Sequence, residues 1–113
     1  MILVTGGVAS GKRTYVRALG YVDEQMSDAL DAPCPVLLDL DELMRAGDLD
    51  GRDWKRLTSK DVVVCHEVGM GVVPMDASDR AWRERVGATC ARLAREASEV
   101  VRVVCGIPVF LKR

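Results

Sequence analysis

The chain has 113 residues, of which 49% are apolar and 29% are charged, and its formal net charge is −1. This length and composition are typical of one globular domain, and we expect residues 1–113 to form a single unit around one hydrophobic core. The small net charge argues against nucleic-acid binding by bulk electrostatics, and no apolar stretch is long enough to span a membrane.

The cysteines indicate a protein that keeps its thiols reduced. None of the four lies in a C-x-x-C pair, and only one histidine is available to join them in a zinc site. Cys65 and Cys105 lie inside apolar runs, where cysteine usually packs as a small buried hydrophobe. The apolar run at the amino end is too short for a signal peptide, so we expect a cytoplasmic location.

The first part of the chain predicts two strands with helical segments between them. Residues 2–5 are apolar throughout, which is typical of a strand inside a parallel sheet. A helix is expected from Gly11 to Gly20. A second helical piece is expected over 22–30, where apolar residues recur at every fourth position. After two prolines, residues 36–39 form a second strand that ends in an acid.

The middle of the chain predicts a weakly ordered connection and a third strand. Residues 41–45 are expected to form a helical turn. The glycine-containing, highly charged stretch 46–60 is expected to be a loop, with a short helix at 54–57. Residues 62–65 are all apolar and form the third strand. Trp54 is expected in the core or at an interface, as is Trp82 further along.

The last part predicts a long helix and a closing hairpin. Residues 76–98 carry an apolar stripe at helical spacing, with Asp76 or Ser78 available as the cap. The stripe comprises Trp82, Val86, Leu93 and Ala97. Strands are expected at 100–105 and 109–111, joined by a tight turn at 106–108 that makes them antiparallel. The order of elements predicts an α/β fold with a small, mostly parallel sheet flanked by helices.

A glycine-rich stretch joins the first strand to the first helix. Gly6, Gly11 and Lys12 occupy the G-x-x-x-x-G-K positions of a phosphate-binding loop. Backbone N–H groups of such a loop surround phosphate oxygens, and the lysine contacts the β- and γ-phosphates. The candidate binding residues are Gly6, Gly7, Val8, Ala9, Ser10, Gly11, Lys12, Arg13 and Thr14. Arg13 stands where the motif requires a serine or threonine that ligates Mg²⁺. The alternative is a glycine-rich turn that binds nothing.

Acidic residues follow two of the predicted strands. Asp39 is the candidate Mg²⁺ ligand because carboxylates at the carboxyl ends of parallel strands face the phosphate loop; Asp41 is its substitute. The alternative for Asp39 is a cap at a strand end. Glu67 is the second candidate catalytic residue beside Lys12, and its alternative is a solvated loop position. His66 has a pKa suited to acid–base or nucleophilic chemistry, or else serves structurally.

Three segments resemble the adenosylcobinamide kinase / adenosylcobinamide-phosphate guanylyltransferase family of cobalamin biosynthesis. The family loop G-G-x-R-S-G-K-S appears here as residues 6–13, with Ala9 for its arginine and Arg13 for its last serine. The family segment N-E-V-G-M-G-x-V-P appears as residues 66–74, with His66 for its asparagine. Residues 103–109 are similar to its V-x-G-I-x-V tail.

The resemblance implies a P-loop NTPase-like fold and an enzyme that phosphorylates adenosylcobinamide with ATP or GTP and Mg²⁺. It also implies a homo-oligomer, a trimer in the family. Family members are longer, and the region that carries their guanylylated histidine has no counterpart here, so guanylyl transfer is not expected. The alternative is a non-catalytic relative that binds nucleotide or corrinoid as a regulator or subunit.

Overall fold

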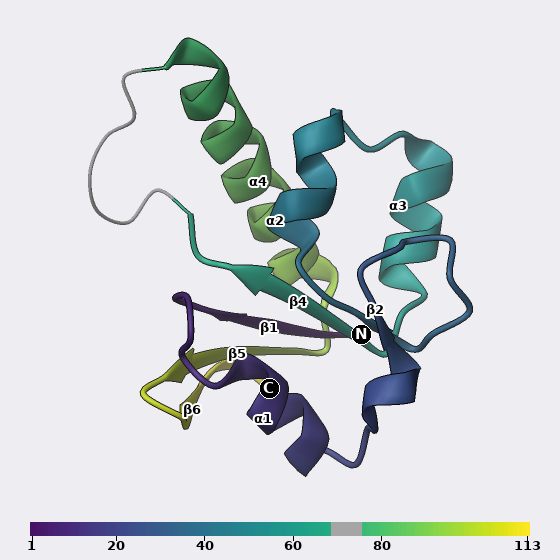
Figure 1. Cartoon of the computed structure of the whole chain (residues 1–113), viewed down its shortest axis with the longest axis vertical. Coiled ribbons are helices and arrows are strands. Elements are labelled where there is room, and N and C mark those ends of the chain that lie inside the picture. Colours follow the sequence, from purple (N-terminus) through teal and green to yellow (C-terminus); the bar gives the residue numbers. More distant parts are fainter. Residues whose placement is uncertain (69–75) are drawn as a thin grey trace.

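The computed structural model describes residues 1–68 and 76–113, and within them six strands form one sheet (Figure 1). Their order across the sheet is β2-β3-β4-β1-β5-β6. The strands are β1 (Ile2–Gly6), β2 (Met26–Ser27), β3 (Val36–Leu37), β4 (Val62–His66), β5 (Glu99–Val104) and β6 (Ile107–Lys112). All neighbours are parallel except β5 and β6, so the predicted fold class is confirmed.

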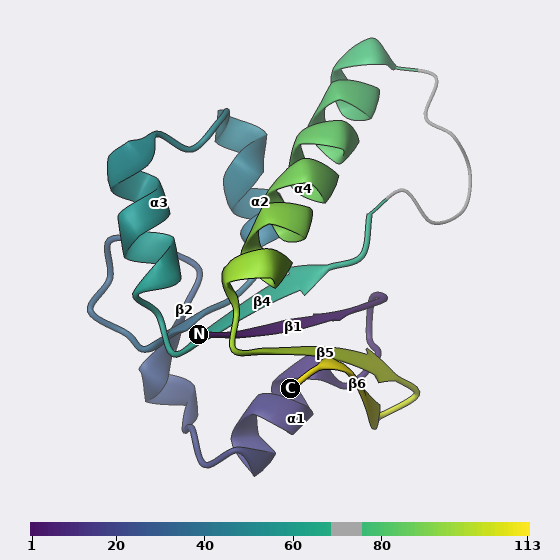
Figure 2. The ribbon, with the colours of Figure 1, turned by 180° about the vertical axis from the view of Figure 1, so that it is seen from behind.

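Helices cover both faces of this sheet. The α-helices are α1 (Lys12–Ala18), α2 (Leu40–Leu43), α3 (Gly51–Thr58) and α4 (Ala77–Glu96), and Asp23–Gln25 and Met44–Ala46 are 3-10 turns. Helix α1 lies on one face, and α2, α3 and α4 lie on the other (Figures 1 and 2). No described helix has both the length and the apolar character that crossing a bilayer requires.

The central strand explains why the core has two halves. Side chains alternate across a strand, so Leu3 packs into the cluster under α2, α3 and α4, whereas Val4 packs into the cluster that contains Val16 of α1. Both are almost completely buried. A strand covered on both faces must be apolar at every position, and this is the pattern of residues 2–4.

The long helix α4 confirms the predicted apolar stripe. Trp82, Val86, Leu93 and Ala97 are all buried against the sheet and its neighbouring helices. The carboxylate of Asp76 accepts a hydrogen bond from the Ser78 N–H at 2.8 Å, which makes Asp76 the cap. The short helix expected at 54–57 is a longer one, α3, because Asp50 and Asp53 cap each other's backbone N–H groups at its start.

Residues 22–30 do not form the expected helix. The chain makes a single 3-10 turn at Asp23–Gln25 and then extends into β2, where Met26 pairs with Val36 of β3. The side chain of Gln25 accepts the Val22 N–H at 2.9 Å, which closes the turn locally. Val22 is exposed, whereas Met26 and Leu30 pack against different core clusters, so the fourfold spacing does not mark one buried helical face. Pairing at the sheet edge decides the conformation.

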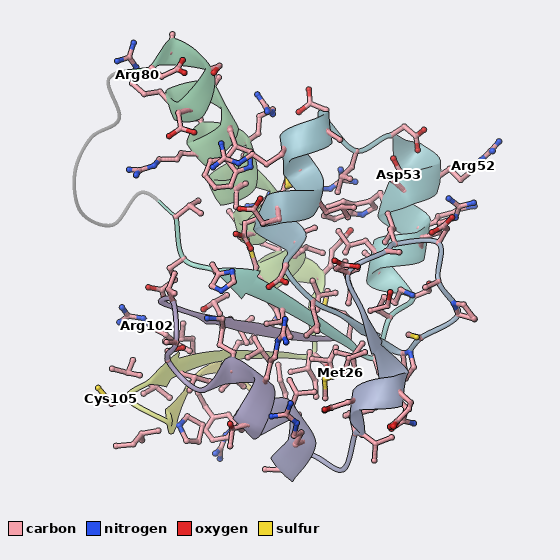
Figure 3. All side chains as sticks on the ribbon, viewed as in Figure 1. Met26, Arg52, Asp53, Arg80, Arg102 and Cys105 are labelled. Atoms are coloured by element: carbon pink, nitrogen blue, oxygen red, sulfur yellow. The ribbon has the colours of Figure 1, made fainter. Side chains whose placement is uncertain are left out.

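The closing hairpin is antiparallel as predicted, but its turn lies earlier than expected. Cys105 (φ 51°) and Gly106 (φ 76°) are both left-handed, as two-residue hairpin turns require. Cys105 is therefore exposed at the tip of the turn rather than buried, as Figure 3 shows. Strand β6 then runs to Lys112, longer than the expected 109–111.

Candidate phosphate and cation site

The glycine-rich loop connects the end of β1 to the start of α1. Gly6 requires the absence of a side chain: a Cβ built there would lie 2.5 Å from Ser10 Oγ and 2.6 Å from the Val103 carbonyl oxygen. Ala9 (φ 56°) and Gly11 (φ 99°) are left-handed, and the Ser10 N–H donates to the Gly7 carbonyl oxygen at 3.3 Å. These contacts fold residues 7–11 into a tight loop at the carboxyl end of the central strand.

The hairpin turn between β5 and β6 supports this loop from the side. The N–H of Gly106 donates to the Ser10 carbonyl oxygen at 2.7 Å. A Cβ on Gly11 would approach the Gly106 Cα to 3.1 Å, so the two glycines pack backbone to backbone. The loop is therefore held by residues close to the other end of the sequence.

Lys12 is the one lysine buried within the described residues, at 5% exposure. Its ammonium donates to the Gly7 carbonyl oxygen and lies 3.5 Å from Ser10 Oγ. Burial lowers the pKa of Lys12, while the carboxylates of Asp41, Asp39 and Glu67 oppose that shift. The side chain thus lies over the loop with its charge incompletely compensated, which suits a cation that receives a phosphate group.

Asp39, Asp41 and His66 form a cluster opposite the loop. Asp39 takes a left-handed conformation (φ 55°) between β3 and α2, and His66 is the last residue of β4. The Nδ1 atom of His66 lies 3.1 Å from Asp41 Oδ1 and 3.7 Å from Asp39 Oδ1. Strands β3 and β4 are parallel neighbours, so their carboxyl ends bring these side chains together.

Asp41, the substitute candidate in the sequence, is the more firmly held of the two aspartates. Its Oδ1 accepts the His66 backbone N–H at 3.1 Å, and its side chain is only 5% exposed. The indole Nε1 of Trp82 donates to the Asp41 carbonyl oxygen at 2.7 Å, so α4 fixes the position of α2. The sequence analysis did not predict this role of Trp82. The only indication in the sequence was that a tryptophan in an apolar stripe carries an N–H group, which usually finds an acceptor when it is buried.

Arg13 and Glu67 each form an ion pair at the edge of the site. The guanidinium Nη2 of Arg13 lies 3.5 Å from Asp39 Oδ2, and its side chain is 57% exposed. Glu67 forms a bidentate pair with Arg102 of β5, at 2.6 and 3.1 Å. The Glu67 N–H also donates to the Gly6 carbonyl oxygen at 2.9 Å, so this residue is tied to the loop and to β5. Nothing near Arg102 in the sequence pointed to this partner.

These groups line one cavity of about 750 Å³ at the carboxyl ends of β1, β3 and β4. The lining residues that bear on its chemistry are Val8 to Thr14, Asp39, Asp41, His66, Glu67, Trp82 and Arg83. All the sequence-derived candidates except Gly6 and Gly7 are among them, and those two form the loop's connection to β1. Residues 69–74, which carry most of the second resemblance, lie outside the described residues.

The fold and the loop define an α/β protein of the P-loop class. The family model for cobinamide kinase / cobinamide phosphate guanyltransferase matches residues 38–111. The chain belongs to this family. The matched range contains Asp39, Asp41, His66 and Glu67, whereas the phosphate loop precedes it.

Two curated relatives match over 58 residues, which is 51% of this chain and 32% of each relative. The bifunctional adenosylcobalamin biosynthesis protein CobU of Salmonella typhimurium is 45% identical over that stretch. Its namesake in Escherichia coli is 43% identical. The matched stretch thus corresponds to about a third of the length of these relatives.

Proposed function

We propose that this chain binds a nucleoside triphosphate and transfers its terminal phosphoryl group to a cobinamide-type alcohol in cobalamin biosynthesis. The observation that supports it is the convergence of the loop, Lys12 and two carboxylates on one cavity, in a chain of this family. Either ATP or GTP fits the proposal, because the loop recognises phosphate oxygens rather than the base.

In this proposal each group has a distinct task. The loop N–H groups and Lys12 hold the β- and γ-phosphates, and phosphoryl transfer depends chiefly on such positioning and charge stabilisation. The Arg102 pair holds Glu67 beside the loop, where it orients the acceptor. The carboxylates of Asp39 and Asp41 are the hard oxygen donors that Mg²⁺ prefers, and Mg²⁺ would neutralise charge on the phosphates. Arg13 replaces the hydroxyl ligand, so these two acids would hold the metal.

A non-catalytic relative that binds nucleotide or corrinoid is the second candidate. It is favoured by the Arg13–Asp39 ion pair, which places a guanidinium where other loops supply a metal ligand. Guanylyl transfer through His66 is not part of either proposal, because the residue stands in a different motif from the family's nucleophile. Incubation with radiolabelled GTP should leave no acid-labile label; a label that His66→Ala removes would contradict this.

The decisive experiment separates binding from turnover. Calorimetry should show nucleotide binding to the unmodified protein and at least tenfold weaker binding to Lys12→Ala, with exposed Lys55→Ala on α3 as the matched control. Equal affinity in all three, or no binding to any, would refute a phosphate site. Incubation with Mg-ATP or Mg-GTP and adenosylcobinamide should then yield the phosphorylated product. Binding without product would favour the second candidate.

We also propose that the protein forms a homo-oligomer, a trimer by resemblance. Apolar side chains remain exposed along β5 and β6, including Val104, Ile107, Val109 and Leu111. Such a patch commonly marks a protein interface. Light scattering should give a multiple of 12.4 kDa at micromolar concentration, and a monomer mass would contradict the proposal.

A further inference from the structure

The cation side of the cavity contains an imidazole as well as carboxylates. His66 Nδ1, Asp39 and Asp41 offer one donor atom each, and these atoms lie within 4.8 Å of one another. They come from the ends of two adjacent parallel strands and the short helix after one of them, so their proximity follows from the topology. His66 stands where the family segment that the chain resembles has asparagine.

The two separations that involve His66 match those of ligands around a single ion. Zinc-type bonds of about 2.0–2.2 Å place two ligands about 2.8–4.4 Å apart, from a right angle to opposite sides. The His66 Nδ1 atom is 3.1 Å from Asp41 Oδ1 and 3.7 Å from Asp39 Oδ1, both inside that interval. The Arg13 guanidinium that pairs with Asp39 is mostly exposed, and an exposed pair of this kind contributes about 0–1 kcal/mol. It can therefore turn to solvent when a cation binds.

We propose that Asp39, Asp41 and His66 form a site for a divalent transition metal, of the Mn²⁺, Co²⁺ and Zn²⁺ group, in preference to Mg²⁺. Carboxylates alone suit Mg²⁺ and Mn²⁺ alike, whereas an imidazole donor favours transition metals over Mg²⁺. One of the ligands is already oriented: the His66 N–H fixes the Asp41 carboxylate, and Trp82 fixes the Asp41 backbone. Such surrounding hydrogen bonds strengthen metal sites.

The inference rests on the proposed function only for what the metal would do during phosphoryl transfer. Metal binding itself requires no nucleotide, so an experiment can refute the metal site without refuting the proposed function, and the reverse. A protein that binds the metal but no nucleotide retains this site and loses the proposed activity. A protein that binds nucleotide but no transition metal retains the proposed activity and loses this site.

The test uses Mn²⁺, because manganese has little affinity for the exposed thiol of Cys105. Electron paramagnetic resonance should show Mn²⁺ binding to the nucleotide-free protein, and millimolar Mg²⁺ should displace it poorly. Pulsed measurements should show a directly bound ¹⁴N nucleus. His66→Asn should abolish the nitrogen signal and weaken Mn²⁺ binding about tenfold or more, while Mg²⁺ binding changes less than threefold.

Two further variants keep the result interpretable. Cys105→Ser should bind Mn²⁺ like the unmodified protein, because the turn that carries it contributes no ligand. Asp39→Asn should weaken Mn²⁺ binding while leaving the nitrogen signal in the fraction that binds, and circular dichroism should confirm that each variant is folded. An unchanged nitrogen signal and affinity in folded His66→Asn would overturn the proposal. So would the absence of Mn²⁺ binding to the unmodified protein at millimolar concentration.

Discussion

Gly6 is the position where a single methyl group should be most damaging to the loop. Its φ is +156°, and a Cβ there would lie 2.6 Å from the Val103 carbonyl oxygen, which belongs to the neighbouring strand β5. The second close atom, Ser10 Oγ at 2.5 Å, can rotate away, but the carbonyl is fixed in the sheet. Gly6→Ala must therefore displace the loop or separate β1 from β5.

The expected cost has two parts. An unfavourable backbone conformation for alanine costs about 1–3 kcal/mol, and overpacking against a fixed backbone costs about 1–3 kcal/mol. The lower entropy of the unfolded alanine chain offsets about 0.4–1 kcal/mol. The net loss in the free energy of unfolding is about 1–5.6 kcal/mol, which lowers the melting temperature by about 4–22 °C.

Urea unfolding followed by circular dichroism measures this loss as a lower midpoint at constant slope. The neighbouring Gly7→Ala is the matched control, because a Cβ there has no atom within 4 Å and its φ is not left-handed. We expect it to change stability by less than about 0.5 kcal/mol. Similar losses in the two variants would show that the close approach at Val103 does not determine the choice of glycine, and would refute the reasoning.

Three other changes test the surroundings of the loop. Arg13→Ser removes an exposed ion pair with Asp39 that is worth about 0–1 kcal/mol. The nucleotide affinity measured with Mg²⁺ should therefore rise up to about fivefold, and phosphate binding measured without metal should fall. If calorimetry with and without Mg²⁺ finds neither change, Arg13 lies outside the site. Trp82→Phe leaves the buried Asp41 carbonyl oxygen without its hydrogen-bond donor and should reduce the free energy of unfolding, measured in urea titrations, by about 1–3 kcal/mol. An unchanged free energy of unfolding would show that this hydrogen bond contributes nothing to stability. Burial lowers the pKa of Lys12 and a bound phosphate should raise it again, so nucleotide binding should take up protons between those two pKa values and weaken as the pH rises through that window. Calorimetry in two buffers of different ionisation enthalpy detects the uptake, and Lys12→Ala should abolish it.

Local patterns predicted the framework of the site because its parts follow strand ends. The spacing of Gly6, Gly11 and Lys12 indicated a loop between a strand and a helix, and the loop does join β1 to α1. Asp39 and Glu67 were expected near it because each follows an apolar run. Parallel strands place such positions at one edge of the sheet, and both residues line the cavity.

Partners across the sheet were not predictable in the same way. The Glu67–Arg102 pair and the Gly106–Ser10 hydrogen bond join residues that are distant in the sequence, and neither has a local signal. Asp41 was only the substitute for Asp39 as a candidate Mg²⁺ ligand, because the sequence does not reveal that Trp82 and the His66 N–H hold Asp41 in place. The prediction of a helix over residues 22–30 was wrong although a local pattern supported it. The apolar residues do have helical spacing, but strand pairing with β3 decides the conformation.

The position of β1 at the centre of the sheet has a consequence for how the protein is made. Its register joins Ile2 to Val62 on one side and to Glu99 on the other, so this strand is synthesised before both of its partners. Until then the apolar side chains of Leu3 and Val4 have no sheet against which to pack. Pairings so distant in sequence also favour slow folding, on the order of milliseconds to seconds. Since the Gly106 N–H supports the Ser10 carbonyl oxygen, the glycine-rich loop takes its final form only after the hairpin has formed.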